Sequence, residues 1–268
     1  MIQAQENVSR LRLVKLMFLL SKDRRLSKRL PVYDFVPYKY GPFSFELYHD
    51  LSGLERMGCV EDTNEAVHYL KGPSSGIDEE TNMIILNKME ELRSWDDNRL
   101  VREIYRTYPE YTIFSQIDQR VQYHRDQTGV VTIGYEGRTI DSFIMSLIKN
   151  KVHLLMDVRR NPISRRYSFS KTRLKENLAK FDIEYEHLPQ LGISSFERRG
   201  LEDIQDYQSL FERYRNGLHE NDSTIQRIID ISRTKMVALM CYEGDVRYCH
   251  RGVIAEFIRG RGIGVAEI

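Results

Sequence analysis

Long apolar runs are missing from this 268-residue sequence. The longest run near the N-terminus, Leu16–Leu20, is far shorter than the roughly 20 residues of a membrane helix, and basic residues follow it closely. No signal peptide is visible either, so we expect a cytoplasmic protein without a membrane partner. The hydrophobic fraction of 41% and the charged fraction of 29% are typical of a globular protein and exclude a disordered or fibrous chain.

Cysteine is scarce as well. The three cysteines, Cys59, Cys241 and Cys249, cannot all pair within one chain, so a reducing compartment suits them. The sequence has no CxxC pair, which is the usual signature of a structural zinc site. A zinc ion held by Cys241, Cys249, His250 and His187 is therefore disfavoured. The cofactor is unknown at this point, and a divalent cation bound by carboxylates stays open.

An excess of charge is also lacking, because the net charge is only +1. This balance hides two basic clusters. Arg10–Arg29 contains eight basic residues and one acid, and Arg159–Arg173 contains six basic residues and no acid. The pattern indicates anionic partners at specific places rather than a generally cationic surface.

The first half of the chain, residues 1–123, is mainly helical by its periodicity. A two-stranded hairpin is expected at Cys59–Val60 and Val67–Leu70, and Val32–Pro42, with two prolines and a third directly before it, is expected to be an extended connection. Helices are expected at 11–20, after the capping residue Ser44 until Gly58, at 78–94 and at 98–107. Helices followed by a hairpin are the order of a winged helix.

The same region carries a resemblance to a known family. The stretch KLMFLLSKDRRLSKRLPVYDFVPYKYGPFSFELYHDLSGLERMGCV, from Lys15 to Val60, combines a "KL" helix with a "YGP" element before the next helix. This combination resembles the antitoxin-like family called Panacea. The resemblance implies a winged-helix-like module that binds DNA or docks onto a protein.

The second half, residues 129–268, alternates strands with helices. Such alternation predicts an α/β domain with a mostly parallel, Rossmann-like sheet between two helical layers. Strands are expected at 130–135, 152–158, 185–188, 236–241 and 265–268, and helices at 139–150, 171–181, within 201–232 and at 249–261.

Polar residues follow each of the first four predicted strands. Ligands of such sheets bind beyond the carboxyl ends of the strands, so these residues are expected to line one crevice. They come from four segments: Gly134–Arg138, Asp157–Tyr167, His187–Gly192, and Cys241–Glu243 with Cys249–Arg251. The segment Ser194–Arg199, between two glycines, could form a flap beside them.

These segments carry a second resemblance. TIGYEGRTIDSF, DVRRNPISRRYSFS, YEHLPQLG and ALMCYEGDVRYCHRGVIAE occur in this order and are similar to the domain-of-unknown-function family 488. The resemblance implies an α/β sheet with a shared pocket. The matched positions are Asp157, Arg159, Pro162, Ser164, Arg165, His187, Cys241, Glu243, Cys249, His250 and Arg251.

Three arginines, Arg159, Arg165 and Arg251, are the predicted anion ligands. Guanidinium groups form paired hydrogen bonds with phosphate oxygens, and the helix that begins near Cys249 adds free N–H groups. The alternative is that these arginines pair internally with Asp157 and Glu243. Five further residues are predicted to border the ligand: Tyr135, Glu136, Ser164, Tyr242 and Cys249.

Four residues are the candidate catalytic groups. Asp157 or Glu243 could act as a general base or hold a cation, and His187 or His250 could carry a proton. The alternative is that Asp157 only orients the arginines. Cys249 is a possible nucleophile, but the arginine of a CxxxxxR phosphatase loop is replaced by Ala255, so buried structural thiols are favoured.

Together these features predict a nucleic-acid-associated protein. Its α/β domain would bind a phosphorylated ligand, either a nucleotide or nucleic acid, and a hydrolase or lyase reaction on that ligand stays open. The alternative is a non-catalytic ligand sensor or antitoxin-like regulator whose winged helix contacts DNA or protein. A homo-oligomer is compatible with the sequence.

Overall fold

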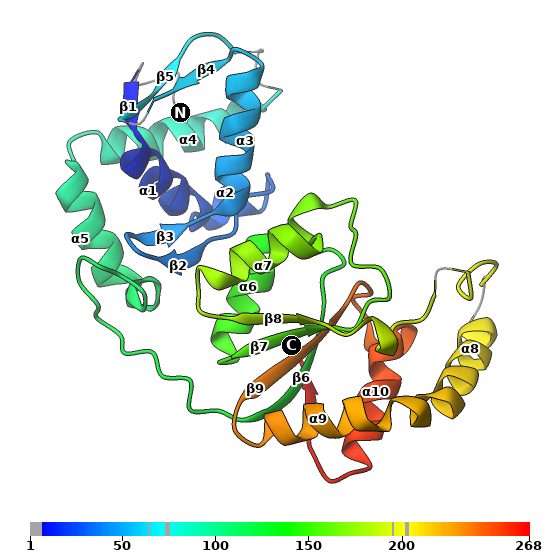
Figure 1. Ribbon diagram of the computed structural model, residues 1–268. Coiled ribbons are helices and arrows are strands. Elements are labelled where there is room, and N and C mark those ends of the chain that lie inside the picture. Colours follow the sequence, from blue (N-terminus) through cyan, green and yellow to red (C-terminus); the bar gives the residue numbers. More distant parts are fainter. Residues whose placement is uncertain (1–6, 64, 73–75, 195, 202–203) are drawn as a thin grey trace. The chain divides into compact units, whose positions relative to one another are not determined.

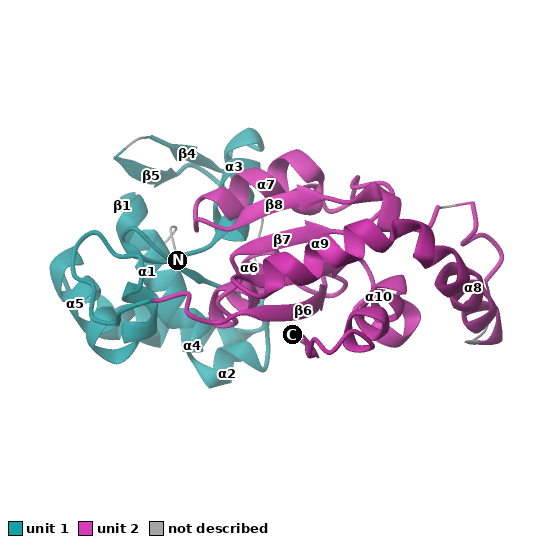
Figure 2. Cartoon of the chain, turned by 60° about the horizontal axis from the view of Figure 1, so that its bottom comes forward, with its two compact units in different colours: residues 1–123 teal, residues 124–268 magenta. Residues whose placement is uncertain are grey.

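The computed structural model describes residues 7–63, 65–72, 76–194, 196–201 and 204–268 (Figure 1). The chain divides into two compact units, residues 1–123 and residues 124–268, which are described separately (Figure 2). Among the described residues, we find no helix with both the length and the apolar character needed to cross a bilayer.

Unit 1 is mainly helical. Its helices are α1 (Arg10–Ser21), α2 (Arg24–Ser27), α3 (Phe45–Arg56), α4 (Glu79–Leu92) and α5 (Asp97–Thr107). An antiparallel sheet has the order β1 (Asn7–Ser9), β5 (Ala66–Tyr69), β4 (Val60–Asp62). As expected, Ser44 caps α3, where its Oγ accepts a hydrogen bond from the Leu47 amide at 3.3 Å. The β4–β5 hairpin also lies where the sequence predicts it.

The segment Val32–Pro42 differs from its prediction as an extended connection. It forms most of a second hairpin, in which β2 (Val36–Tyr38) pairs with β3 (Gly41–Phe43). Pro37 and Pro42 lie opposite each other in this pair. A two-stranded ribbon tolerates prolines because their missing N–H groups do not interrupt a larger sheet. The pattern of prolines therefore predicted an extended connection where the chain forms a hairpin.

This hairpin encloses a buried lysine. The side chain of Lys15, on α1, is 2% exposed, and its ammonium group donates hydrogen bonds to the carbonyl oxygens of Tyr40 and Pro42. Gly41 has a positive φ of 85°, and a Cβ atom there would lie 2.6 Å from the ring of Tyr105. Only glycine suits that position. The backbone carbonyls of the Tyr-Gly-Pro element thus accept the hydrogen bonds of the buried Lys15 side chain.

Unit 2 is an α/β unit built on a five-stranded parallel sheet, which confirms the predicted sheet. Its strand order is β10 (Val265–Glu267), β6 (Gly129–Gly134), β9 (Met236–Cys241), β7 (Leu154–Asp157), β8 (Glu184–His187). The helices are α6 (Ile140–Lys149), α7 (Lys171–Ala179), α8 (Ile204–Gly217), α9 (Asp222–Ser232) and α10 (His250–Arg259).

The central strand β9 is buried on both faces. Val237, Leu239 and Cys241 belong to one apolar cluster with residues of α9 and α10, and the alternate residues Ala238 and Met240 face the other side of the sheet. Figure 1 shows α9 and α10 on one side of the sheet and α6 and α7 on the other. Because β6, β7, β8 and β9 run parallel, their carboxyl ends meet at one edge.

Candidate functional site at the carboxyl edge of the sheet

A cavity of about 230 Å³ opens at this edge of unit 2. It is lined from the ends of β6, β7 and β9 and from the segment after β8. The lining residues are Tyr135, Arg159, Arg160, Asn161, Ile163, Ile193, Arg198, Cys241 and Tyr242. Three arginines and two tyrosines thus line one small space. The predicted crevice exists, although its lining only partly matches the predicted residues.

Asp157, at the end of β7, is completely buried and accepts four hydrogen bonds, one of them from the backbone amide of Arg159 at 3.1 Å. Arg159 reaches both carboxylate oxygens, with Nε 2.8 Å from Oδ1 and Nη2 2.6 Å from Oδ2. The hydroxyl of Tyr185, on β8, donates to Oδ2 at 2.7 Å. Burial opposes the charge of Arg159, but the Asp157 carboxylate outweighs it and raises the pKa of the guanidinium. This geometry favours the interpretation that Asp157 orients Arg159.

Arg159 also organises the loop after β7. Its Nη1 donates to the hydroxyl of Tyr135 at 2.9 Å, and its Nη2 donates to the Phe169 carbonyl at 2.9 Å. The Tyr135 ring stacks on Phe169 with ring centroids 4.4 Å apart, and its hydroxyl is 3.4 Å from the Ser164 oxygen. His187 forms a 2.9 Å hydrogen bond through Nε2 to the Arg159 carbonyl. Tyr135, Ser164 and His187 therefore position the loop.

The other two predicted anion ligands do not line the cavity. Arg251 is completely buried, and its guanidinium donates to the carbonyl oxygens of Glu243 and Gly244 and to Glu267. It therefore braces the β9–α10 loop. Arg165 is exposed and makes no hydrogen bond or ion pair within the described part of the chain. The structure does not bring Arg159, Arg165 and Arg251 into one cradle, because internal carbonyls already occupy Arg251.

Two other arginines take part instead. Arg160 is exposed, and its Nη1 lies 3.2 Å from the Pro189 carbonyl. Arg198, from the predicted flap, donates to the Glu243 carboxylate and to His250 Nδ1. Ser195 of that flap lies outside the described residues. In the sequence, Arg198 stands beside Arg199 in the segment after the third predicted strand of the second half. Spacing alone could not show that Arg198 lines the cavity.

Close backbone packing explains two of the motif glycines. A Cβ atom on Gly134 would overlap the Glu243 carbonyl, and a Cβ atom on Gly192 would overlap the backbone nitrogen of Arg160. Both glycines therefore allow one loop of the site to lie directly on another. Glu136 strengthens the first contact, since its carboxylate accepts the Gly244 amide at 2.8 Å.

Behind the cavity, the two thiols and the imidazole form a buried cluster. Sγ of Cys241 and of Cys249 lie 3.7 and 3.9 Å from Nδ1 of His250, and the three donor atoms lie within 4.8 Å of one another. Glu243 Oε2 is 3.1 Å from the Cys241 sulfur. Burial alone would raise the pKa of Cys241, but the Cys249 thiol, His250 and Arg198 lower it. Burial and the Cys241 sulfur raise the pKa of Cys249.

The partners of His250 define its tautomer. Nε2 lies 3.0 Å from the Val158 carbonyl, which can only accept, so Nε2 carries the proton. Nδ1 faces the Arg198 guanidinium at 2.9 Å, which can only donate, so Nδ1 presents a lone pair. Nδ1 of His250 thus accepts a hydrogen bond from Arg198, and the two sulfurs lie 3.7 and 3.9 Å from the same nitrogen.

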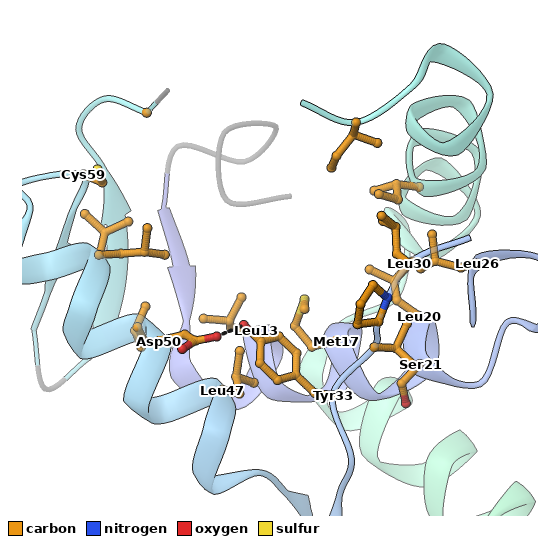
Figure 3. Close-up of a pocket in the computed structure, with 18 of the residues that line it drawn as sticks. Leu13, Met17, Leu20, Ser21, Leu26, Leu30, Tyr33, Leu47, Asp50 and Cys59 are labelled. Carbon is orange, nitrogen blue, oxygen red and sulfur yellow. Dashed lines mark hydrogen bonds between the residues drawn. The ribbon is translucent and has the colours of Figure 1, made fainter. Parts of the chain in front are cut away.

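Unit 1 has its own cavity, of about 400 Å³, lined mostly by apolar side chains of α1, α3 and residues 26–33 (Figure 3). Among its polar residues, Tyr33 donates a 2.7 Å hydrogen bond to Asp50. Burial and this carboxylate raise the pKa of Tyr33.

Comparison with known proteins agrees with the resemblance in the C-terminal half. Residues 139–258 match the model of a family described as Domain of unknown function DUF488. The match begins at the N-cap of α6 and ends within α10, so it includes Asp157, Arg159 and the thiol cluster. No curated protein and no solved structure matches the chain. The resemblance of the N-terminal segment to the Panacea family stays a prediction.

Proposed function

We propose that unit 2 binds the phosphate group of a nucleotide or of a nucleic acid in the cavity at the carboxyl edge of its sheet. The observation that carries this proposal is the presence of three arginines, Arg159, Arg160 and Arg198, in the lining of one cavity of about 230 Å³. Guanidinium groups bind phosphate oxygens through paired, charge-assisted hydrogen bonds. A strand-end crevice in a parallel sheet is also the usual ligand position.

The two tyrosines favour a ligand with a base. Tyr135 and Tyr242 meet edge to face with ring centroids 5.3 Å apart, and Tyr242 is 46% exposed. An exposed aromatic ring beside a phosphate site can stack on a nucleobase, which contributes about 1–3 kcal/mol per base. Asn161, also in the lining, offers an amide to the same ligand.

Binding without turnover is the form of this function that the geometry supports best. All four predicted catalytic groups have internal partners: Asp157 holds Arg159 and Tyr185, Glu243 holds Arg198, His187 meets a carbonyl, and His250 is bonded at both ring nitrogens. A general base needs a free lone pair within reach of the proton it removes. This arrangement favours the ligand-sensing alternative over a hydrolase or lyase.

A calorimetric titration of the full-length protein with ATP, inorganic phosphate and a 5′-phosphorylated single-stranded oligonucleotide tests the proposal. Arg160→Ala should weaken binding about 10- to 100-fold, the effect of losing a charge-assisted hydrogen bond of about 1.5–3 kcal/mol. Arg233→Ala is the matched control. Arg233 is an exposed arginine at the end of α9, paired with Asp230 and outside the cavity lining.

Failure of all three probes to bind, or equal losses in both variants, would reject the cavity as a phosphate site. Binding should also weaken as salt is raised, because phosphate contacts release counterions. Turnover of ATP or of the oligonucleotide would restore the enzyme alternative.

The role of unit 1 extends this proposal. We infer that it recruits nucleic acid or a protein partner, on the strength of the basic residues of α1 and α2 and the β4–β5 hairpin. The winged-helix assignment, the cytoplasmic location and a homo-oligomeric state are predictions from the sequence.

A further inference from the structure

We propose that four donor groups at the end of β9 and the start of α10 form a structural Zn²⁺ site: Cys241, Cys249, His250 and Glu243. The sequence analysis disfavours zinc because no CxxC pair exists. The sequence spacing does not indicate a set of metal ligands. The fold nevertheless brings Cys241, the last residue of β9, beside the first turn of α10. This proposal does not depend on the phosphate proposal.

The distances between the donor atoms fit a tetrahedral ion. With Zn–S near 2.3 Å and Zn–N near 2.0 Å, the edges of such a tetrahedron are about 3.5–3.8 Å. The two sulfurs lie 3.7 and 3.9 Å from His250 Nδ1, and Glu243 Oε2 lies 3.1 Å from the Cys241 sulfur. The donor atoms of Cys241, Cys249 and His250 lie within 4.8 Å of one another, so shifts of these side chains would bring them to the edges of the tetrahedron, and the Glu243 carboxylate would turn toward them.

The orientation of His250 points to a metal ligand. Metal-binding histidines usually donate their second ring N–H to a backbone carbonyl or a carboxylate, which fixes the ring and its tautomer. Here Nε2 donates to the Val158 carbonyl at 3.0 Å, and Nδ1, which accepts from Arg198, lies 3.7 and 3.9 Å from the two sulfurs. His187, the other imidazole in the sequence-based ligand set, is bonded to the Arg159 carbonyl instead. Glu243 therefore replaces it as the fourth ligand.

The chemistry of the set selects zinc. Two sulfurs with one imidazole and one carboxylate suit Zn²⁺, whereas Mg²⁺ and Ca²⁺ prefer oxygen ligands alone. Four protein ligands leave no open position, and Cys241, Cys249 and His250 are at most 2% exposed. A closed, buried set is typical of a structural site rather than a catalytic one.

A cation already contacts two of these donors. The Arg198 guanidinium donates to the Glu243 carboxylate and to His250 Nδ1. Positive charge is thus favoured at this point. Zn²⁺ would displace this guanidinium, so Arg198 competes with the metal.

Titration of the reduced, chelator-treated full-length protein with Co²⁺ tests the site. We expect one equivalent of Co²⁺ to give thiolate-to-cobalt charge-transfer and tetrahedral d–d absorption, and one equivalent of Zn²⁺ to abolish both. Cys249→Ser should lose the charge-transfer band of its sulfur. Cys59→Ser and His187→Ala should keep the full spectrum, since Cys59 lies in unit 1 and His187 is bonded elsewhere.

Two further variants separate the roles of the carboxylate and the guanidinium. Glu243→Gln should bind Co²⁺ more weakly and keep the charge-transfer band, and unchanged affinity would remove Glu243 from the ligand set. Arg198→Gln should bind Co²⁺ several-fold more tightly, because the competing cation is gone. Absence of the absorption, or its persistence in a Cys241→Ser/Cys249→Ser double variant, would overturn the proposal. Recovery of a Cys241–Cys249 disulfide in metal-free protein purified under reductant would overturn it as well.

Discussion

Arg159 holds both carboxylate oxygens of Asp157, two residues earlier in the chain, at 2.8 and 2.6 Å. Both side chains are buried, with Asp157 at 0% and Arg159 at 6% exposure. Such a pair stabilises a fold only while both partners are present, because removal of one partner leaves the other as an unpaired buried charge. The Asp157–Arg159 pair therefore fixes the loop that carries one wall of the cavity.

The first prediction concerns this pair. Asp157→Asn should lower the free energy of unfolding of unit 2 by about 3–5 kcal/mol, since Arg159 loses its counterion in a buried position. Hydrogen exchange at the amides of β7 and β9 measures this change. Asp230→Asn removes an exposed carboxylate from its pair with Arg233 and should cost less than about 1 kcal/mol. A similar, small cost in both variants would contradict the structural role of the pair.

The strands β6, β7 and β9 could be predicted because they are largely apolar runs separated by turns. β9 begins and ends at the predicted residues, and the ends of the other strands lie within two residues of their predictions. The strand β1 and the β2–β3 hairpin could not be predicted in this way. Each of these strands is only three residues long, and in the β2–β3 hairpin Pro37 is paired with Pro42.

The site was only partly predictable, for a physical reason. Spacing shows which residues follow a strand, but it does not show which way a side chain turns. Arg251 lies in the first turn of α10, close to the end of β9, as expected. Its guanidinium nevertheless points inward and donates to three oxygen atoms. Arg198 and Glu243 meet across 45 positions of sequence, and only the fold reveals that contact.

The second prediction concerns Gly192. Gly192→Ala should destabilise unit 2 by about 1–3 kcal/mol or more, because the new methyl group overlaps the backbone of Arg159 and Arg160, which cannot move as a side chain can. Hydrogen exchange and a titration with ATP would show lower stability and weaker binding together. Gly217→Ala is the matched control at the end of α8, where a Cβ atom meets nothing within 4 Å. Equal behaviour of the two variants would disprove the close packing.

The third prediction concerns the buried lysine of unit 1. Burial lowers the pKa of Lys15 from 10.5 to about 7. In the unfolded chain the amine keeps its ordinary pKa, so between about pH 7 and 10.5 the unfolded state binds one more proton than the folded state. The free energy of unfolding should therefore rise with pH in this window, by up to 1.36 kcal/mol per pH unit, which is about 4 kcal/mol between pH 7 and 10.

Urea denaturation followed by tryptophan fluorescence measures this effect in unit 1, because the only tryptophan, Trp95, packs against its core cluster. The pH-dependent rise should be present in the wild type and in Lys28→Met, which alters an exposed lysine of the same unit. It should be missing in Lys15→Met, whose side chain cannot titrate. Lys15→Met also leaves the Tyr40 and Pro42 carbonyls without their donor, so its absolute stability at high pH should fall below that of the wild type. Parallel pH profiles for the three proteins would show that the Lys15 amine keeps its charge when it is buried against the Tyr-Gly-Pro element.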